Sequence, residues 1–320
     1  MKVLNQTISQ ITIPTPFAVG DVHVYLIKGD TMSLVDAGVK TKQAWEAVQT
    51  QLKELGYFPN DIEQIILTHH HPDHIGLIEE FPRVESIIAH EDLNAWLTRD
   101  ETFFQHYENF FKDFFITCGV PEKYLSIIDK LHGQLNLAGR GNLTSIINEG
   151  DYLPGHPEWQ VVETAGHAQS HLSFLRQSDG LFIGGDHILK HISSNPLLEP
   201  PPLGEQKRPK PLLQYRNNLQ KCLTLGIQQV LPGHGSIIDN IDELIPTRLS
   251  RQEQRAKKVL TLLENTSMTP FQVTQKLFPK RYETQLDLTL SETTGQLDFL
   301  ESQGLIQQEV IEGILSYHAV

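Results

Sequence analysis

The clearest chemical signal in this sequence is a cluster of histidines and an aspartate that follows a short apolar stretch. Residues 69–74 read His-His-His-Pro-Asp-His, which is the pattern H-x-H-x-D-H. At the histidine and aspartate frequencies of this chain, the pattern would arise by chance roughly 0.002 times. Imidazole nitrogen and carboxylate oxygen together suit zinc, and also iron or manganese. The cluster therefore predicts a metal site, with zinc as the expected metal.

The order of these residues predicts room for two metal ions. Side chains two apart at the end of a strand point the same way, so His69 and His71 can close on one ion. The chain is then expected to turn into a helix, so Asp73 and His74 point in another direction and suit a second ion. Two divalent ions about 3.5–4 Å apart can share a water and lower its pKa from about 15.7 towards 7. The expected nucleophile is this bridging hydroxide, with Asp73 placed to orient it.

Two ions need more ligands, and three later segments offer them. Each is a β-rich run that ends at a glycine followed by a residue able to bind a metal. The three junctions are Gly166-His167, Gly185-Asp186 and Gly233-His234. Glycine lets the backbone turn sharply, so the side chain that follows can face a site at the end of the strand.

Over residues 10–240, approximately, this set of motifs resembles the metallo-β-lactamase superfamily of metal-dependent hydrolases. The resemblance implies two divalent metal ions per chain and an α/β (α+β) fold, the αββα sandwich, with the site at the strand ends. By position it implies that His69, His71 and His167 bind one metal, that Asp73, His74 and His234 bind the second, and that Asp186 bridges them. Asp36 matches an early aspartate that supports the ligands from behind. Asp73 and Asp186 are therefore the expected catalytic residues.

The remaining histidines have other expected roles. His171 follows His167 by four residues and is expected to support the ligands, whereas His187 and His191 flank Asp186 and are candidates for substrate contact. His70 is expected to point away from the metals. The histidines expected at the surface are His23, His106, His132, His156 and His318.

Alternating strands and helices are expected to position these residues. Periodicity and turn residues predict strands at 22–27, 33–35, 62–67, 86–89, 160–163, 171–175, 181–183 and 228–231. They predict helices at 41–55, 73–81 and 212–225, with two more in a phenylalanine-rich helical insertion at about 100–140. Six prolines between 196 and 211 exclude regular structure there. The expected catalytic domain is 1–245.

The pattern changes near the C-terminus. Helices are predicted at 250–263, 270–277 and 285–302, followed by a hairpin of 305–310 and 314–318. These are the parts of a small winged-helix-like domain, expected at 246–320. Such a domain could cover the active site or mediate a homodimer.

The substrate is predicted only as a class. The bridging Asp186 and the complete motif resemble the glyoxalase II-like and lactonase-like branches, which implies an ester, thioester or lactone carbonyl in a small, partly apolar molecule. β-Lactamases usually lack that aspartate. The sequence contains no GxSxG nucleophile motif and no P-loop, and no GxGxxG follows a strand, so nucleotide-driven chemistry is not expected. A flavodiiron redox protein would need a flavin-binding module, for which the last 80 residues show no pattern.

The main rival is a metal-dependent endoribonuclease acting on single-stranded RNA, because the C-terminal segment also resembles the lactamase-like-protein-2 group. Five basic residues favour this alternative: Arg248, Arg251, Arg255, Lys257 and Lys258. Charge opposes it, since the chain has 26 Lys and Arg against 39 Asp and Glu, a net charge of −13. Residues 250–320 hold 7 basic and 9 acidic residues, so this segment is also acidic. Without an apolar leader or membrane span, a cytoplasmic protein is the expectation.

Overall fold

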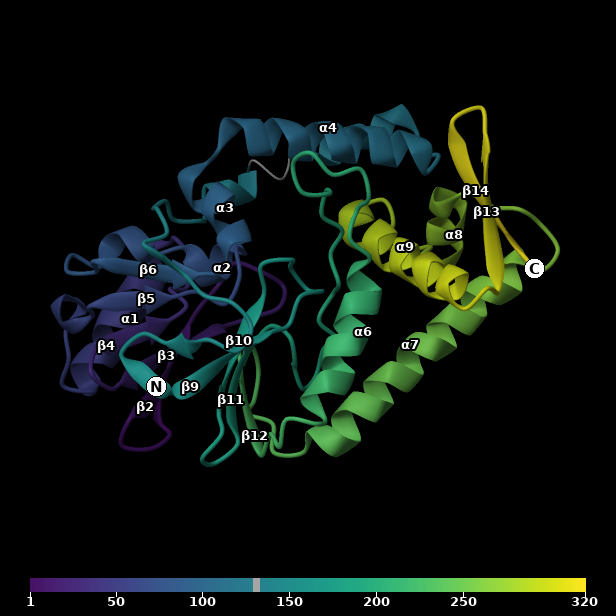
Figure 1. The fold of residues 1–320 in the computed structure, drawn as a ribbon. Coiled ribbons are helices and arrows are strands. Elements are labelled where there is room, and N and C mark those ends of the chain that lie inside the picture. The colour runs from purple at the N-terminus through teal and green to yellow at the C-terminus, as the bar shows by residue number, and fades with distance from the viewer. Residues whose placement is uncertain (129–132) are drawn as a thin grey trace. The chain divides into compact units, whose positions relative to one another are not determined.

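The computed structural model describes residues 1–128 and 133–320, and His132 lies outside them. The chain forms two compact units, each built from three segments (Figure 1). The sandwich unit consists of Met1–Asp100, Gly133–Ser194 and Asn218–Ile241. The helical unit consists of Glu101–His132, Asn195–Asn217 and Asp242–Val320. The expected insertion and the expected C-terminal segment therefore belong largely to one unit.

The first sheet of the sandwich unit has seven strands among the described residues. In spatial order they are β1 (Lys2–Val3), β2 (Ile8–Ile13), β3 (Val22–Lys28), β4 (Met32–Val35), β5 (Gln64–Ile66), β6 (Ser86–Ala89) and β7 (Ser145–Ile146). Strands β1 to β4 pair antiparallel, and β4 to β7 pair parallel. The strands expected from β3 to β6 are confirmed, whereas β1, β2 and β7 were not expected.

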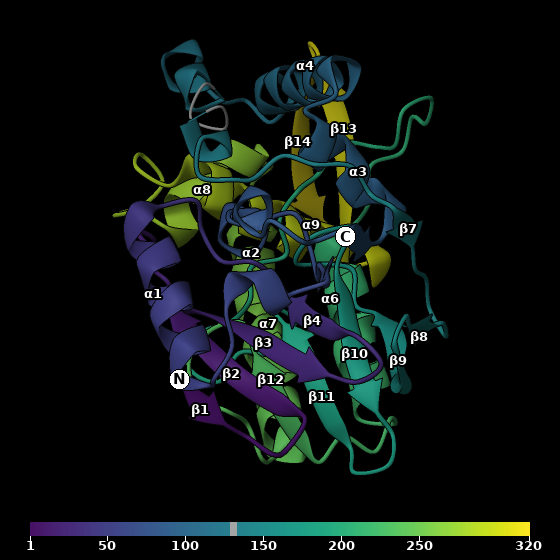
Figure 2. The same ribbon diagram turned by 90° about the vertical axis from the view of Figure 1, so that its left-hand side faces the viewer.

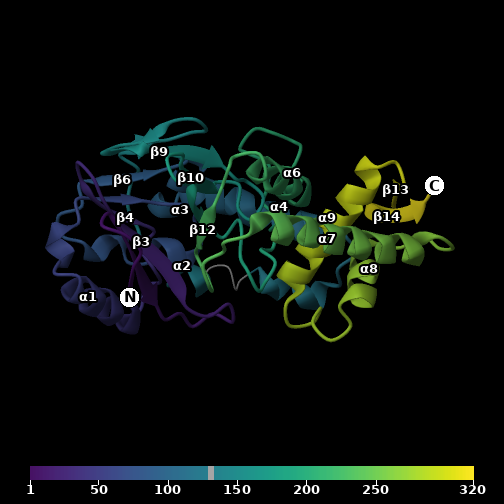
Figure 3. The same ribbon diagram turned by 90° about the horizontal axis from the view of Figure 1, so that it is seen from below.

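The second sheet has five strands in the described part of the chain, in the spatial order β12-β11-β10-β9-β8. They are β8 (Tyr152–Leu153), β9 (His156–Glu163), β10 (Leu172–Arg176), β11 (Leu181–Gly185) and β12 (Gln229–Pro232). Strands β11 and β12 pair parallel, and the other neighbours pair antiparallel. Figure 3 shows β9 and β10 as a layer separate from β3 and β4.

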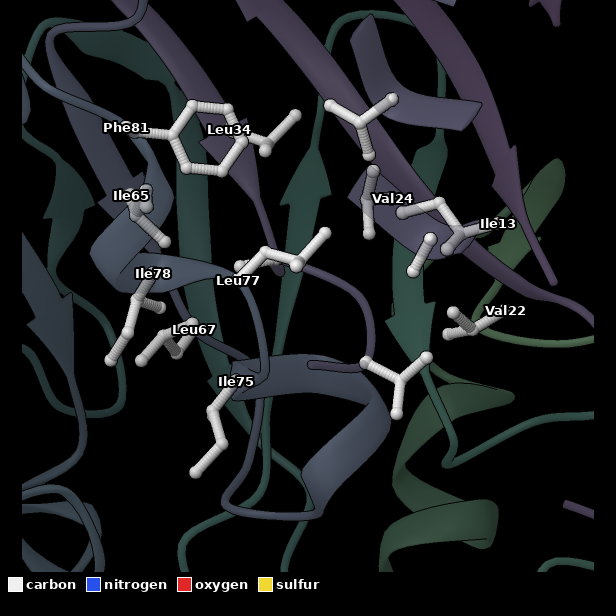
Figure 4. Packing of buried hydrophobic residues seen from close by; sticks show 14 of the residues in the cluster. Ile13, Val22, Val24, Leu34, Ile65, Leu67, Ile75, Leu77, Ile78 and Phe81 are labelled. Atoms are coloured by element: carbon white, nitrogen blue, oxygen red, sulfur yellow. The ribbon is translucent and has the colours of Figure 1, made fainter. Parts of the chain in front are cut away.

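Alternation along β3 explains why the two sheets stack. Val22, Val24 and Leu26 point to one side, into a cluster that includes residues of the helices. Figure 4 shows Val22 and Val24 in this cluster. Tyr25 and Ile27 point to the other side, into a core shared with the second sheet. The second sheet contributes Trp159, Val161, Leu172, Phe174, Ile183 and Leu231 to that core. Each such buried side chain stabilises the fold by about 1.5–3 kcal/mol, and the result is the expected mixed α/β sandwich.

Helix α1 (Lys42–Glu54) lies against the first sheet (Figure 2). It begins where the Thr41 hydroxyl accepts a hydrogen bond from the Ala44 amide, at 3.1 Å. Its buried face carries Ala44, Val48 and Leu52, which have the spacing of an amphipathic helix. The expected helix at 41–55 is confirmed.

The single helix expected at 73–81 is wrong. The structure has a short α2 (Pro72–Ile75) and a separate 3₁₀ turn at Ile78–Glu80. Between them, Gly76 donates to Gly38 O at 2.6 Å, and its Cβ would lie 2.2 Å from Lys40 N if it had one. This close backbone approach takes the hydrogen bonds that a continuous helix would need.

In the helical unit, the C-terminal elements pack around one apolar core. They are α7 (Ile241–Leu263), α8 (Pro270–Leu277), α9 (Leu286–Ser302) and the hairpin of β13 (Ile306–Ile311) and β14 (Ile314–Ala319). The expected start of α7 at 250 is wrong, because Pro246 lies inside the helix and removes one backbone hydrogen bond without ending it. The hairpin turn is confirmed, with φ of 52° at Glu312 and 82° at Gly313.

The other helical parts belong to the segments that precede α7. They are α4 (Glu101–Thr117), a 3₁₀ helix at Glu122–Ile127, and α6 (Pro211–Cys222), which crosses from the helical unit into the sandwich unit. The sandwich unit also contains α3 (Asn94–Thr98) and 3₁₀ turns at Pro59–Asp61 and Glu91–Leu93. Among the described residues, no helix combines the length and apolar character needed to cross a membrane.

The proline-rich stretch before α6 lies along α9 in the helical unit. Arg208 forms a bidentate ion pair with Asp298, at 2.7 and 2.8 Å, and the Leu198 amide donates to Ser291 Oγ at 3.1 Å. Helix α9 is therefore covered on its polar side as well as on its apolar side, which explains why its sequence has little amphipathic character.

Candidate metal centre

The expected metal ligands come together in the sandwich unit at the ends of four strands. His69, His71, Asp73 and His74 follow β5, and His167, Asp186 and His234 follow β9, β11 and β12. Most of these side chains are buried, and His69 and His74 have no exposed surface. The strands of both sheets thus place residues more than 160 positions apart in one polar cluster.

His69, His71 and His167 form a first group, whose candidate ligand atoms all lie within 4.8 Å of one another. His71 Nδ1 lies 3.0 Å from His69 Nε2 and 2.9 Å from His167 Nε2. In a tetrahedral zinc site with nitrogens about 2.0–2.1 Å from the metal, neighbouring nitrogens are about 3.3 Å apart. The three imidazoles therefore need to separate only slightly to hold one cation.

Asp73, His74 and His234 form a second group, again with candidate ligand atoms within 4.8 Å. His234 Nε2 lies 3.3 Å from Asp73 Oδ2. The other ring nitrogen of His234 donates to the backbone carbonyl of Asp21 at 2.7 Å, which turns Nε2 toward the group.

Asp186 lies between the two groups. Its Oδ2 is 3.6 Å from His167 Nε2 and 3.5 Å from His234 Nε2, and its Oδ1 is 3.5 Å from His74 Nε2. One carboxylate thus faces ligand nitrogens of both groups. This is the position that a carboxylate bridging two metals would take.

Polar atoms without partners show that these residues fit a metal. Within the described part of the chain, His74 Nε2, His234 Nε2 and Asp186 Oδ1 are buried and have no hydrogen-bond partner. Leaving such an atom unsatisfied costs about 1–3 kcal/mol, so native structures rarely do so. A divalent cation would satisfy all three, and a set of imidazoles and carboxylates suits zinc.

Asp36 supports these ligands from behind. Its carboxylate accepts hydrogen bonds from His74 Nδ1 at 2.7 Å, from the Thr68 amide at 2.8 Å and from Thr68 Oγ1 at 2.8 Å. Thr68 Oγ1 in turn accepts a hydrogen bond from His69 Nδ1, at 2.9 Å. Asp36 therefore fixes the proton of His74 on Nδ1 and leaves Nε2 facing the metal position.

The electrostatics divide the cluster into neutral and charged parts. Burial lowers the pKa values of His69 and His71 well below the usual range, and the neighbouring imidazoles lower them further. Burial also lowers the pKa of His74, but the carboxylates of Asp36 and Asp186 outweigh it and raise that pKa well above the usual range. Burial opposes ionisation of Asp186, yet His234 and His74 hold the pKa of its carboxyl well below the usual range. Neutral His69 and His71 and ionised Asp186 are the forms that bind metal, whereas His74 would release a proton when a cation binds.

The three histidines expected around the ligands lie in different environments. His171 Nε2 accepts a hydrogen bond from the Asp186 amide at 3.1 Å, and its Nδ1 bonds to Thr164 Oγ1 at 2.7 Å, so both ring nitrogens serve to support the centre. His187, expected at the substrate, has no exposed surface. His191 is exposed, and its Nε2 lies 3.4 Å from Ser236 Oγ, two residues beyond His234.

His70 points away from the ligand groups, as expected. Its ring stacks on Trp96 with centroids 4.0 Å apart, and its Nδ1 lies 3.1 Å from Ser170 Oγ. Burial lowers the pKa of His70 to about 3, so the ring is neutral. The stack anchors the middle of the loop whose outer residues belong to the two candidate ligand groups.

Two histidines expected at the surface are in fact buried. His23 Nε2 donates to Gly235 O at 2.7 Å, beside His234, and its amide donates to Gly233 O at 2.7 Å. His156 bonds to Ser33 Oγ at 2.6 Å. The period-two pattern of β3 places His23 on the same face as Tyr25, so alternation could have indicated that it faces the interior.

Comparisons with known proteins agree with this site. Residues 18–234 match the family model described as "Metallo-beta-lactamase superfamily". The "Probable metallo-hydrolase YqjP" of Bacillus subtilis is 40% identical over 296 residues, which is 92% of each chain. A "Beta-lactamase-like protein 2 homolog" of Caenorhabditis elegans is 23% identical and covers 83% of this chain and 73% of its own length.

Two further similarities concern a shorter stretch and the fold. The "Atrochrysone carboxyl ACP thioesterase" of Aspergillus fumigatus is 28% identical over 106 residues, 33% of this chain and 30% of that protein. A crystal structure of a metallo-beta-lactamase family protein from Thermus thermophilus superposes with a TM-score of 0.81 at 24% identity, covering 99% of this chain and 100% of that one. With a family match over more than half its length, the chain belongs to the metallo-beta-lactamase superfamily.

Proposed function

We propose that this protein is a hydrolase that uses two divalent cations, zinc first among them, to cleave an ester, thioester or lactone carbonyl in a small, partly apolar substrate. The observation that carries the proposal is Asp186, whose two oxygens face ligand nitrogens of both groups at 3.5–3.6 Å. His69, His71 and His167 would hold one cation. Asp73, His74 and His234 would hold the other.

When bound, two such ions would lower the pKa of a shared water from about 15.7 towards 7 and supply a nucleophile at neutral pH. The chain's own residues prepare the place for it. Asp186 sets the separation of the two groups, and Asp73, at the start of α2, is the carboxylate that would orient the attacking water. The hydrogen bonds that His74 donates to Asp36 and that His234 donates to Asp21 O keep the two histidine rings in place.

Two considerations favour a carbonyl substrate. The aspartate between the two groups matches the glyoxalase II-like and lactonase-like pattern, and one relative of part of this chain is named as a thioesterase. The attacking oxygen would come from a metal-activated water, since the sequence has no GxSxG nucleophile motif.

A single-stranded RNA substrate is the second candidate, and the helical unit weakens its support. Of the five basic residues on α7, Arg248 is buried with its guanidinium 3.4 Å from Tyr215 Oη. Arg255 forms an ion pair with Glu292. Arg251, Lys257 and Lys258 remain exposed, too few to oppose the acidic charge of this segment.

The test is to load the protein with metal and measure its content and activity. We expect two zinc equivalents per chain and turnover of at least one thioester, lactone or carboxylic ester, in a panel that also contains a phosphodiester and single-stranded RNA. Asp186→Ala should abolish turnover, while Asp30→Ala, at an exposed turn, should leave it unchanged. One zinc equivalent, or turnover retained by Asp186→Ala, would refute the binuclear mechanism, and activity on RNA alone would establish the second candidate.

A further inference from the structure

The segment that leads into His167 is held only in part by its own hydrogen bonds, in which the Thr164 amide donates to His171 O at 2.9 Å and the Gly166 amide donates to Ala168 O at 3.2 Å. Strand β9 ends at Glu163, and Gly166 has φ of 138°, a conformation that glycine adopts readily. His167 must nevertheless reach the His69–His71 pair from the far sheet. The carbonyl groups of Glu163 and Ala165, just before this ligand, are held by an element outside the segment.

Helix α6 supplies that element with two side chains. Lys221 Nζ donates to the carbonyl of Glu163 at 2.6 Å, and Asn218 Nδ2 donates to the carbonyl of Ala165 at 2.8 Å. Residues three apart share one face of a helix, and carbonyls two apart share one side of an extended chain. The two donors and the two acceptors are therefore matched in spacing.

The surroundings of Lys221 strengthen this contact. Its ammonium group also forms an ion pair with Glu149 at 3.1 Å, and the Glu149 carboxylate accepts from the Glu163 amide. The end of β9 is thus held at both its N–H and its C=O. Donation from a charged ammonium is about twice as strong as a neutral hydrogen bond.

We infer that Asn218 and Lys221 are positioning residues for the His167 ligand, a role that rests on the proposed function because it takes His167 as a metal ligand. Neither side chain belongs to a ligand group. Both act through the peptide units just before His167. Loss of outer partners typically costs 10–100-fold in metal affinity, and here the loss falls on the cation held by His69, His71 and His167.

The test compares two neighbouring asparagines. Asn218→Asp keeps the size of the side chain but replaces the donating amide with an oxygen that repels Ala165 O, whereas Asn217→Asp adds the same charge at a neighbouring position that is not buried. Metal-free protein is titrated with zinc against a competing chelator, and folding is checked by circular dichroism. We expect one of the two zinc dissociation constants to rise at least tenfold in Asn218→Asp, the other to stay within twofold, and both to stay within twofold in Asn217→Asp.

A second pair of variants, at Lys221, controls for a general loss of structure. Lys221→Met should weaken the same zinc site, and Lys221→Arg, which keeps a charged donor, should restore most of its affinity. Wild-type constants in Asn218→Asp, or equal weakening of both sites or in both asparagine variants, would overturn the inference. Failure of wild-type protein to bind two zinc ions would instead count against the proposed function, so the two failures are distinguishable.

Discussion

The hydrogen bond between Asp36 and His74 allows a quantitative prediction about metal affinity. In Asp36→Asn, the side-chain oxygen must stay on the Thr68 amide, which Asp36 Oδ1 accepts at 2.8 Å. The new amide nitrogen then faces His74 Nδ1, which in the wild-type protein donates a hydrogen bond to Asp36 Oδ2 at 2.7 Å. Two donors cannot face each other, so the His74 proton is driven to Nε2, the atom that should bind the metal.

The magnitude follows from the bond that is lost. A hydrogen bond to a charged group contributes about 1.5–3 kcal/mol. At about 1.4 kcal/mol per tenfold, this is a loss of roughly 10–150-fold in affinity for the cation held by His74. Backbone strain adds little, because Asp36 has φ of 62° and asparagine tolerates this region as well as aspartate does.

The assay is competition between metal-free protein and a chelator for zinc at neutral pH. We expect the site of Asp73, His74 and His234 to weaken by that factor, with the His69–His71–His167 site changed less. Asp30→Asn removes one exposed carboxylate and serves as the matched control. A folded Asp36→Asn protein that binds both zinc ions with wild-type affinity would show that Asp36 does not set the protonation of His74.

Three further predictions concern the site, the pH response and the helical unit. Gly233→Ala would place a methyl group 2.3 Å from Asp186 Oδ1, so zinc content and activity should both fall sharply. Burial lowers the pKa of His156, so this histidine binds a proton more readily in the unfolded chain as pH drops below about 6.5. The free energy of unfolding should therefore fall by at most about 1.4 kcal/mol per pH unit because of this residue. His156→Gln should reduce that slope in urea titrations of metal-free protein. Arg208→Met leaves the buried Asp298 carboxylate with weaker pairing and should lower unfolding free energy by about 3 kcal/mol.

Each of these has its own control. Gly133→Ala adds a methyl group that has no heavy atom of the described residues within 4 Å, so normal zinc content is expected there. Equal loss in both glycine variants would contradict a steric cause. An unchanged pH slope in His156→Gln would mean that the buried ring titrates like an exposed one. Lys207→Met, at an exposed neighbour of Arg208, should not alter stability. If it matched Arg208→Met, charge removal alone would explain the loss.

The sequence predicts which histidines and aspartates come together in the structure, because the spacing of these residues is a local property. His69 and His71 after an apolar strand, and Asp73 and His74 at the start of a helix, follow from periodicities of two and 3.6 residues. The glycine junctions before His167, Asp186 and His234 follow from local turn chemistry. These signals need no knowledge of which strands are neighbours.

The supporting residues could not be predicted in the same way. Alternation along β3 could place His23 in the interior, but its hydrogen-bond partner Gly235 lies 212 positions away and could not be predicted. Asn218 and Lys221 look like the polar face of a helix until the end of β9 lies against them. Gly76 stops a helix only because residues 38–40 approach its backbone. Long-range packing decides all three, and it is not encoded in any window of a few residues.

The composition of the helical unit has a consequence for protein engineering. Its residues come from three stretches of chain, so no single cut excises it as a module. A truncation after residue 245 would cut α7 after its first five residues and would leave Arg208 without its partner Asp298. It would also leave the Cys118 carbonyl without the Phe271 amide that donates to it at 3.1 Å. Exchange of this unit between homologues would therefore require all three stretches to be transferred together.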